Sequence, residues 1–391
     1  MKITTRQADL DAKIPGSVAG FVLLFALGLV VYLLLRRRSH NRPKEESMTP
    51  EKEHLKENDV ETIELMRLER SAVQETVDYI IVLQDWEISP NSLVVMDINL
   101  GEGQFGIVKQ GVWTHPASGK PEDVAVKMLR ENHRESELSS ILSEIKILKK
   151  ANNKRHPNVI KFIGGCFFEG KLLVVTEFCF HGNLKKFLIK SRVSSDSEIL
   201  TPIYANIKST LDHRELLRIA RDVANGMAHL SANKFVHRDL AARNILINKQ
   251  KVAKIADFGL ARDIGSAEEY IRTHQNLLPV KWMALESLLH GCFTTASDVW
   301  SFGVLLYEIT TLGGEPYENI SPYNVIVCIG SGFRMSKPAH CSSEIYKIMR
   351  DCWEENPQCR PTFPKILKEL RGMLTDNENL YINVTHVEDN V

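Results

Sequence analysis

Residues 237–259 contain the residue types and spacings that phosphoryl transfer requires. Residues 237–244 read HRDLAARN, and Asp257-Phe258-Gly259 follows. One carboxylate, Asp239, is available to an attacking hydroxyl, while the oxygens of Asn244 and Asp257 suit a metal that bridges phosphates. The transferred group spreads negative charge over its oxygens, so catalysis consists mostly of positioning and of neutralising that charge. The two motifs therefore predict transfer from a magnesium-bound nucleotide.

A glycine-rich segment lies upstream and is the candidate phosphate loop. Residues 100–108 read LGEGQFGIV, in which Gly101, Gly103 and Gly106 form a GxGxxG pattern. Dinucleotide-binding folds share this pattern, but in those folds a helix follows the glycines. Here residues 107–113 alternate as a strand does. We therefore expect the glycines in a β-hairpin, where bare backbone can close over phosphates.

A lysine and a glutamate are placed to form an ion pair beside this loop. Residues 124–127 read VAVK, which is typical of a strand ending in Lys127, and Glu144 lies in ILSEIKIL, which has helical apolar spacing. A lysine on a strand can pair with a glutamate on a facing helix and is then held against the α- and β-phosphates. Single charged residues are usually surface groups, so this prediction depends on the motifs at 237–259.

Two groups of elements must position these segments. Residues 92–178 predict a small lobe, with a twisted antiparallel sheet and the helix that carries Glu144. Residues 179–374 predict a larger and mostly helical lobe, because 215–230 show helical apolar spacing and 301–312 are nearly all apolar. We expect an α+β fold with the nucleotide between the lobes.

Together these motifs resemble those of receptor tyrosine kinases, over about residues 85–374. The pattern is similar to that of the fibroblast-growth-factor, vascular-endothelial-growth-factor and Tie receptor group. The resemblance lies in a long insert after residue 190 and in three segments, DWEI at 85–88, PVKWMALESL at 279–288 and SDVWSFGVLLYEI at 297–309. The very short segment before the apolar run resembles small nematode receptor-like tyrosine kinases, which have almost no ectodomain. The resemblance implies the α+β bilobal protein kinase fold and transfer of the γ-phosphoryl group of ATP to protein tyrosines.

The resemblance also implies a role for individual residues. Asp239 would accept the proton of the substrate hydroxyl, and Asn244 and Asp257 would hold Mg²⁺, or Mn²⁺ in its place. Arg243 resembles the tyrosine-kinase replacement for a lysine of serine/threonine kinases, and Pro279 and Trp282 resemble the platform for a tyrosine ring. The implied ATP-binding set is Leu100, Gly101, Glu102, Gly103, Gly106, Val108, Ala125, Lys127, Glu144, Thr176, Glu177, Cys179 and Leu246.

One departure from the family pattern concerns a structural pair. Glu286 resembles the acid of the family's Ala-Pro-Glu motif, and the resemblance pairs it with Arg360. Here Leu285 stands in place of the proline. We expect fold and activity to be kept, because the buried ion pair contributes more to stability than the proline does.

Three tyrosines are candidates for phosphorylation. Tyr270 is the one tyrosine of the expected activation loop, where a phosphate would add negative charge and pair with Arg238. Tyr204, in the insert at about 191–210, and Tyr381, in the tail, both begin a Tyr-x-Asn motif. Such motifs resemble sites bound by SH2 adaptors through an arginine cluster. Tyr317 also fits the motif, but we interpret it as a packed residue.

An uncharged apolar stretch predicts a membrane anchor. Residues 18–35 read VAGFVLLFALGLVVYLLL, and three arginines follow directly. At ~1.5 Å per residue this helix just spans a bilayer core, and the basic excess indicates that its C-terminal side is cytoplasmic. A cleaved signal peptide is the alternative, but its apolar stretch usually runs ~7–15 residues. We expect a plasma-membrane protein with an extracellular segment at 1–17, a juxtamembrane linker at 36–91, a kinase domain at 92–374 and a tail at 375–391.

Composition limits the expected partners. Of 391 residues 49 are basic and 49 acidic, so the charge balance gives no reason to expect a nucleic acid. The seven cysteines lack paired metal-binding spacing, which favours a reducing compartment over a disulfide framework. Expected partners are ATP, protein tyrosine substrates, SH2 adaptors, and a second copy of the chain or a co-receptor.

Two alternatives stay open at this point. The chain could be a docking receptor with little turnover, although every part that phosphoryl transfer needs is present. Alternatively the kinase part could lie outside the membrane, and then the sequons at Asn319 and Asn383 would carry sugar.

Overall fold

The computed structural model describes residues 82–103, 106–129, 135–168, 171–193, 208–263, 270–271, 279–376, 381–382 and 384–386. The expected membrane span at 18–35, the segment at 1–17 and most of the linker at 36–91 lie outside these ranges. Among the helices that the ranges contain, none is both long enough and apolar enough to cross a membrane.

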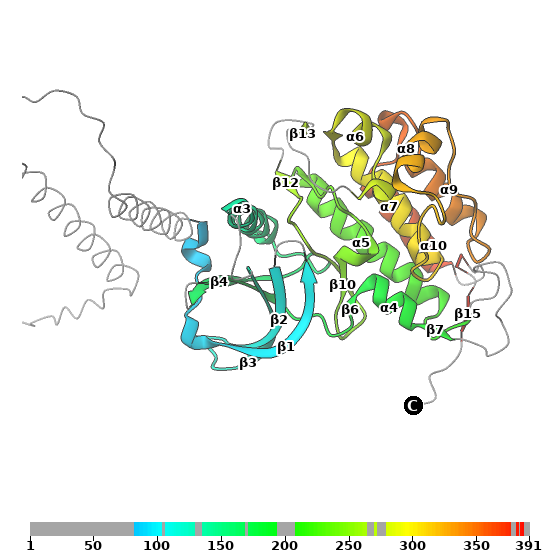
Figure 1. The fold of residues 1–391 in the computed structure, drawn as a ribbon. Coiled ribbons are helices and arrows are strands. Elements are labelled where there is room, and N and C mark those ends of the chain that lie inside the picture. The colour runs from blue at the N-terminus through cyan, green and yellow to red at the C-terminus, as the bar shows by residue number, and fades with distance from the viewer. Residues whose placement is uncertain are drawn as a thin grey trace, which may run out of the picture. The chain divides into compact units, whose positions relative to one another are not determined.

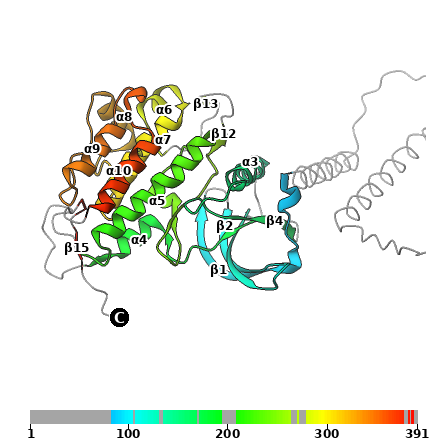
Figure 2. The same ribbon diagram turned by 180° about the vertical axis from the view of Figure 1, so that it is seen from behind.

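The smaller lobe is built on a five-stranded antiparallel sheet in the order β1-β2-β3-β5-β4 (Figures 1 and 2). On β3 the side chains alternate as a pleated strand requires. Val124 and Val126 are buried in the core, so Ala125 and Lys127 point to the opposite face. The strands are β1 (Leu93–Gly103), β2 (Gly106–Thr114), β3 (Pro121–Met128), β4 (Phe162–Phe168) and β5 (Lys171–Glu177).

Helix α3 (Glu135–Asn152) is the one helix that packs on this sheet among the described elements of the lobe (Figure 1). Its apolar residues Ile141, Ile145 and Leu148 recur at helical spacing and are buried. Glu144 precedes one of them and is buried with them. The expected small lobe, a sheet plus the Glu144 helix, agrees with this arrangement.

The lobe begins earlier in the chain than expected. Leu83 and Ile88 are buried, and Trp86 of the 3₁₀ helix η1 (Gln84–Trp86) stacks on Phe162 with ring centroids 5.1 Å apart. A second 3₁₀ helix, η2 (Pro90–Ser92), leads into β1. The last residues of the expected linker at 36–91 are therefore part of the folded lobe, because their aromatic and aliphatic side chains pack into its core.

The larger lobe is mostly helical and contains two long helices, α5 and α7 (Figure 2). Helix α5 (His213–Ala232) starts at a capping box formed by Asp212 and Glu215, and α7 (Thr295–Thr310) starts at one formed by Thr294 and Ser297. Almost every residue of α7 is buried, as its uniformly apolar sequence predicts. The other helices are α4 (Leu184–Lys190), α6 (Leu285–His290), α8 (Pro322–Gly330), α9 (Ser343–Cys352), α10 (Phe363–Thr375), and the 3₁₀ helices η3 (Ala242–Asn244), η4 (Val280–Trp282) and η5 (Pro357–Cys359).

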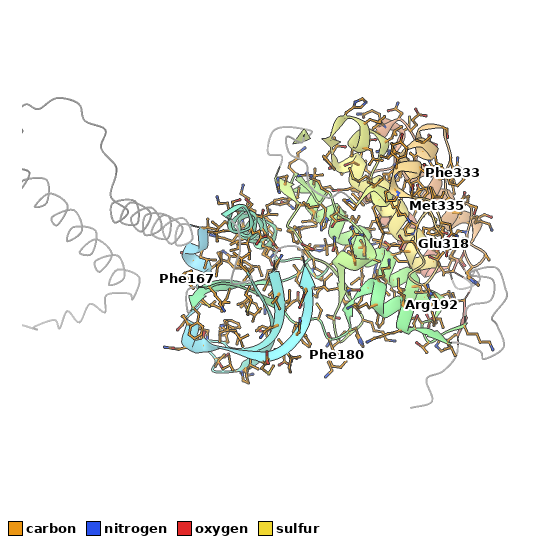
Figure 3. All side chains as sticks on the ribbon, viewed as in Figure 1. Phe167, Phe180, Arg192, Glu318, Phe333 and Met335 are labelled. Atoms are coloured by element: carbon orange, nitrogen blue, oxygen red, sulfur yellow. The ribbon has the colours of Figure 1, made fainter. Side chains whose placement is uncertain are left out.

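Short strands join the loops of this lobe. Strands β6, β10 and β11 form one sheet, and β15, β8 and β7 form another at the base of the insert. Arg192, labelled in Figure 3, anchors that base by donating to the carbonyl oxygens of Thr311 and Leu312. The strands are β6 (Gly182–Asn183), β7 (Arg192–Val193), β8 (Lys208–Ser209), β9 (Phe235–Val236), β10 (Ile245–Ile247), β11 (Ala253–Ile255), β12 (Arg262–Asp263), β13 (Tyr270–Ile271), β14 (Cys292–Phe293) and β15 (Thr385–His386).

The predicted structural pair forms inside this lobe. Arg360 is buried and donates from Nη1 and Nη2 to the two carboxylate oxygens of Glu286, at 2.6 and 2.9 Å. It also donates to the backbone oxygens of Ala296 and Glu354. Leu285 is the first residue of α6, a position that suits proline but does not require it. The missing proline therefore leaves the helix and the pair intact.

We predict that Arg360→Met lowers the free energy of unfolding by about 3–5 kcal/mol, because it leaves the Glu286 carboxylate buried without its cation. Urea unfolding followed by tryptophan fluorescence measures the change. The matched control is Lys347→Met, which removes the exposed Lys347–Asp351 pair and should leave the midpoint unchanged. Equal midpoints for both variants would contradict the assigned role of the buried pair.

Candidate active site

A cleft of about 570 Å³ lies between the two lobes. Its lining includes residues from both lobes that the sequence analysis named for nucleotide and catalysis. They are Leu100, Gly101, Glu102, Gly106, Val108, Ala125, Lys127, Glu144, Thr176, Glu177, Cys179, Asp239, Arg243, Asn244, Leu246 and Asp257. Gly103 is the last residue of β1, beside this set.

The glycine-rich segment contains the end of β1 and the start of β2, two antiparallel strands, as its alternating continuation predicted. Gly103 at the end of β1 is paired with Gly106 at the start of β2. Gly106 has a φ of +149°, and a Cβ there would collide with the carbonyl oxygen of Met128. Only glycine therefore allows the hairpin to lie this close to β3 over the cleft.

Lys127 and Glu144 meet at the back of the cleft. The Lys127 Nζ lies 2.6 Å from the Glu144 Oε2, and both side chains are mostly shielded from solvent. Burial is the largest single effect and lowers the pKa of Lys127. The attraction of the Glu144 and Asp257 carboxylates, with the hydrogen bond to Glu144, together outweighs it, so the pKa is raised. The ammonium group thus stays charged, as it must to bind phosphate oxygens.

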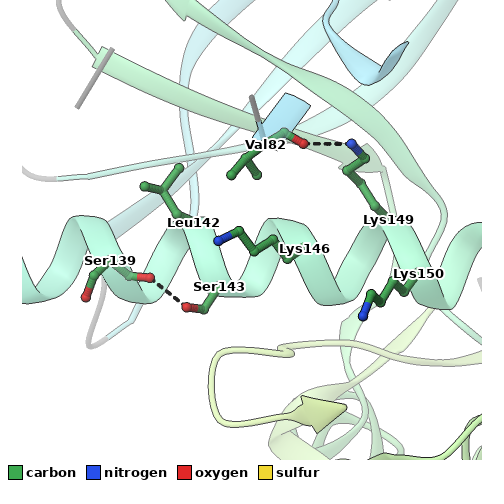
Figure 4. Close-up of a pocket in the computed structure, with 7 residues that line it drawn as sticks. All are labelled: Val82, Ser139, Leu142, Ser143, Lys146, Lys149 and Lys150. Atoms are coloured by element: carbon green, nitrogen blue, oxygen red, sulfur yellow. Dashed lines mark hydrogen bonds between the residues drawn. The ribbon is translucent and has the colours of Figure 1, made fainter. Parts of the chain in front are cut away.

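The far side of α3 is attached to the start of the lobe. A hollow of about 530 Å³ lies there, lined by Val82, Ser139, Leu142, Ser143, Lys146, Lys149 and Lys150 (Figure 4). The Lys149 Nζ donates to the carbonyl oxygens of Val82 and Leu83, at 2.7 and 3.1 Å. These bonds help to hold the helix that presents Glu144, but the hollow contains none of the residues predicted for catalysis.

Asp239 is held by its neighbours in the catalytic loop. The Arg243 Nη2 donates to Asp239 Oδ1, and the Asn244 Nδ2 donates to Asp239 Oδ2 at 2.7 Å. Burial raises the pKa of Asp239, and the guanidinium of Arg243 opposes this effect. A carboxylate with a raised pKa, fixed in the cleft, is suited to accept a proton from a hydroxyl.

Asn244 and Asp257 offer hard oxygen ligands at the same place. The amide nitrogen of Asn244 is bonded to Asp239, so its amide oxygen is the atom left for a metal. Asp257 has a φ of +58°, a left-handed conformation that is unfavourable for a non-glycine residue and is typical of functional sites. One amide and one carboxylate, completed by phosphate oxygens, fit Mg²⁺ better than a softer metal.

Sequence reasoning missed the group that holds the start of the catalytic loop. Asp298 on α7 is buried and accepts hydrogen bonds from the backbone N–H groups of His237 and Arg238, at 2.8 and 2.9 Å. Burial raises its pKa to about 6, while these bonds oppose the rise. Arg238 has a φ of +69°, so the carboxylate supports a backbone conformation that would otherwise be strained.

Arg243 also contacts the predicted tyrosine platform. Its guanidinium carbon lies 4.4 Å from the centroid of the Trp282 ring in η4. Arg243 therefore links the carboxylate of Asp239, the predicted proton acceptor, to the aromatic ring of Trp282.

An ion pair and a hydrogen bond, both made by Glu177, hold the segment that connects the two lobes. Glu177 Oε1 lies 2.9 Å from the Nζ of Lys254 on β11 and accepts from the backbone N–H of Lys161 at 2.7 Å. The Glu177 side chain therefore connects the two lobes. Its backbone N–H and C=O groups are the ones that could hydrogen-bond the adenine base. The thiol of Cys179 stays protonated, because burial raises its pKa to about 12.

The three candidate tyrosines differ in their surroundings. The backbone of Tyr270 pairs with Phe293, whose ring lies 4.4 Å from the guanidinium of Arg238. Tyr204 lies outside the described residues. Tyr381 was expected in an open tail, but it is only 8 % exposed and its hydroxyl donates to Asp376 Oδ2 at 2.7 Å.

Several cleft residues were not predicted from the sequence. Leu148 is one turn after Glu144 on α3, so helical periodicity could have identified it. The others come from strands and loops that only the complete fold brings together. The missed set is Leu148, Ile160, Val174, Phe180, Gly182, Asn183, Ala256 and Leu260.

Comparisons with known proteins agree with this geometry. Residues 94–370 match the family described as protein tyrosine and serine/threonine kinase. The chain is 41% identical over 297 residues to fibroblast growth factor receptor 1 of Pleurodeles waltl, which covers 75% of this chain and 36% of the relative. It is 37% identical over 387 residues to a fibroblast growth factor receptor of Strongylocentrotus purpuratus, which covers 95% of this chain and 39% of the relative.

The chain thus spans less than two fifths of the length of either relative. Within that part, the matched residues include both lobes and the cleft between them. The chain therefore belongs to the protein tyrosine and serine/threonine kinase family.

Proposed function

We propose that the protein is a single-pass membrane tyrosine kinase that transfers the γ-phosphoryl group of ATP to protein tyrosines. The observation that carries this proposal is the cleft in which the Lys127–Glu144 ion pair faces Asp239, Asn244 and Asp257. The contact of Arg243 with both Asp239 and Trp282 favours tyrosine over serine, because the catalytic carboxylate is linked to an aromatic platform.

In the proposed reaction the phenol oxygen of the substrate bonds to the γ-phosphorus while the bond to the β–γ bridging oxygen breaks. Asp239 accepts the phenol proton, and ADP leaves. Lys127 holds the α- and β-phosphates, and its charge is kept by the carboxylates around it. Bound Mg²⁺, or Mn²⁺, supplies positive charge to the phosphates, and Asn244 and Asp257 are the residues that would hold it.

Regulation is proposed to act through Tyr270. The backbone of Tyr270 pairs with that of Phe293 in a two-stranded sheet, and the guanidinium of Arg238 lies over the Phe293 ring. A phosphate on Tyr270 would bring about −1.5 to −2 charge to a segment beside that cation. The resulting ion pair would order the activation loop in its active form.

Membrane attachment and docking complete the proposal. The apolar residues 18–35 would anchor the chain in the plasma membrane, with the N-terminus outside and the kinase in the cytoplasm. A second copy or a co-receptor would supply the partner for phosphorylation in trans. Phosphorylated Tyr204 and Tyr381 would bind SH2 adaptors, and Tyr381 must first leave Asp376, since a phosphate there would be repelled by the carboxylate.

Lys127→Met and Asp239→Asn should each abolish magnesium-dependent phosphotyrosine formation on a tyrosine peptide. The first removes the cation that binds phosphates, and the second removes the proton acceptor. Labelling with radioactive ATP measures the loss, and retained nucleotide binding in Asp239→Asn shows that the cleft is intact. If the wild-type protein bound nucleotide but labelled no tyrosine, the chain would be a docking receptor instead.

Tyr270 should carry phosphate after wild-type protein is incubated with ATP, and it should remain bare in Asp239→Asn. Mass spectrometry of the two preparations, purified free of other kinases, measures the site directly. Because the proposed transfer is in trans, the rate constant should rise with protein concentration. Equal phosphorylation of Tyr270 in both preparations would show that the protein does not phosphorylate this tyrosine itself.

SH2 domains should bind phosphorylated peptides around Tyr204 and Tyr381 at micromolar concentration. In the autophosphorylated full chain, Tyr381→Phe should reduce the captured SH2 domain only if the tail has been released from Asp376. Hydrogen exchange at Ser342 reports that release, because its N–H donates to the carbonyl oxygen of Tyr381. No binding to either peptide would reject the docking sites.

A further inference from the structure

Glu308 on α7 is a buried acid that sequence analysis did not single out. It is 0 % exposed, and its Oε2 accepts two hydrogen bonds. One comes from the backbone N–H of Ala242 and the other from the indole Nε1–H of Trp282, each at 2.9 Å. One carboxylate oxygen therefore joins the catalytic loop to the platform for the substrate ring.

These contacts form a closed circuit through the active site. Ala242 precedes Arg243 in the chain, the guanidinium of Arg243 lies over the ring of Trp282, and Trp282 returns to Glu308. Arg243 also donates to Asp239. A shift of Glu308 would thus move the platform and the proton acceptor relative to one another.

The helix fixes Trp282 at a second point. The Ser301 Oγ donates to the carbonyl oxygen of Trp282 at 2.7 Å. Ser301 and Glu308 are two helical turns apart and share a face of α7, so one rigid element holds both the backbone and the ring of Trp282. The bond to Ser301 locates the backbone, and the bond to Glu308 sets the direction of the indole.

Packing alone does not explain an acid at this position. Burying a carboxylate is unfavourable, and an apolar side chain of the same size would fill the space. Burial raises the pKa of Glu308, while the bonds from Ala242 and Trp282 oppose the rise. Its other oxygen, Oε1, has no hydrogen-bond partner among the described residues, so the group serves these two donors.

We propose that Glu308 is a positioning residue for the phosphoacceptor, which holds the Trp282 platform in register with the catalytic loop. The proposal rests on the tyrosine kinase activity proposed above. It predicts that loss of the carboxylate impairs the use of the tyrosine substrate more than the binding of ATP. Trp282 and Asp239 face the substrate, whereas the Lys127–Glu144 pair that holds the phosphates belongs to the other lobe.

The test compares Glu308→Leu with Glu308→Gln in the full chain, using a tyrosine peptide and ATP. Leucine leaves two buried N–H groups without an acceptor, so kcat/KM for the peptide should fall by about 5- to 100-fold. Glutamine keeps an oxygen that can accept both bonds, so it should stay within about threefold of wild type. The dissociation constant of ATP should stay within about twofold in both variants.

The matched control is Thr310→Val on the same helix. Thr310 is equally buried, but among the described residues its hydroxyl bonds only to the α7 carbonyl oxygens of Leu306 and Tyr307. If Glu308→Leu acts only by destabilising α7, Thr310→Val should lower the peptide kcat/KM to the same extent when both variants have lost the same number of degrees in melting temperature. The proposal expects Thr310→Val to keep the peptide kcat/KM.

Trp282→Phe gives a second route if Glu308→Leu does not fold. It removes the indole N–H and keeps an aromatic ring, so the peptide kcat/KM should fall. Glu308→Gln added to Trp282→Phe should change the peptide kcat/KM little further, since glutamine still accepts from Ala242. An unchanged peptide kcat/KM in Trp282→Phe, or equal losses in peptide and ATP binding, would overturn the proposal. Inactive wild-type protein would instead reject the kinase function itself.

Discussion

The buried helix α7 is the constraint on which the active site depends. The catalytic loop is not a regular strand or helix for most of its length, so its conformation must be imposed from outside. Two carboxylates on α7 do this, with Asp298 at the start of the loop and Glu308 at Ala242. Both are buried, where hydrogen bonds are strong and an unpaired polar group is unfavourable. The loop is thereby held in one conformation.

The other half of the site depends on charge balance in the smaller lobe. Burial lowers the pKa of Lys127, but the carboxylates of Glu144 and Asp257 oppose this effect and the pKa is raised. Because Glu144 lies on α3, the position of this helix decides whether the ion pair forms. Lys149 links the same helix to Val82 and Leu83, so the chain that enters the lobe is connected through α3 to the Lys127–Glu144 pair.

The sequence predicted what lies in short contiguous motifs. HRDLAARN and Asp257-Phe258-Gly259 carry their chemistry in residue types, and the strand-like residues after Gly106 placed the glycines in a hairpin. The Lys127–Glu144 pair followed from one strand and one helix, each recognisable by its period. The general fold could be predicted for the same reason, since each lobe has a clear apolar pattern.

Contacts between distant segments could not be predicted in this way. Asp298 and Glu308 are single acids in an apolar helix, and their partners lie far away in the chain. The buried position of Tyr381 depends on packing that its polar, tail-like sequence does not indicate. The start of the smaller lobe was placed too late, because the stacking of Trp86 on Phe162 is a tertiary contact.

Side chains from separate segments of both lobes line the cleft and would together hold one magnesium nucleotide. Calorimetric titration of the full chain with a non-hydrolysable ATP analogue, with and without Mg²⁺, measures this binding. Binding should be tighter with the metal in wild-type protein, and Asp257→Asn should lose this metal-dependent gain while retaining metal-free binding. Absence of nucleotide binding by the wild-type protein, or a metal effect that persists in Asp257→Asn, would contradict the account.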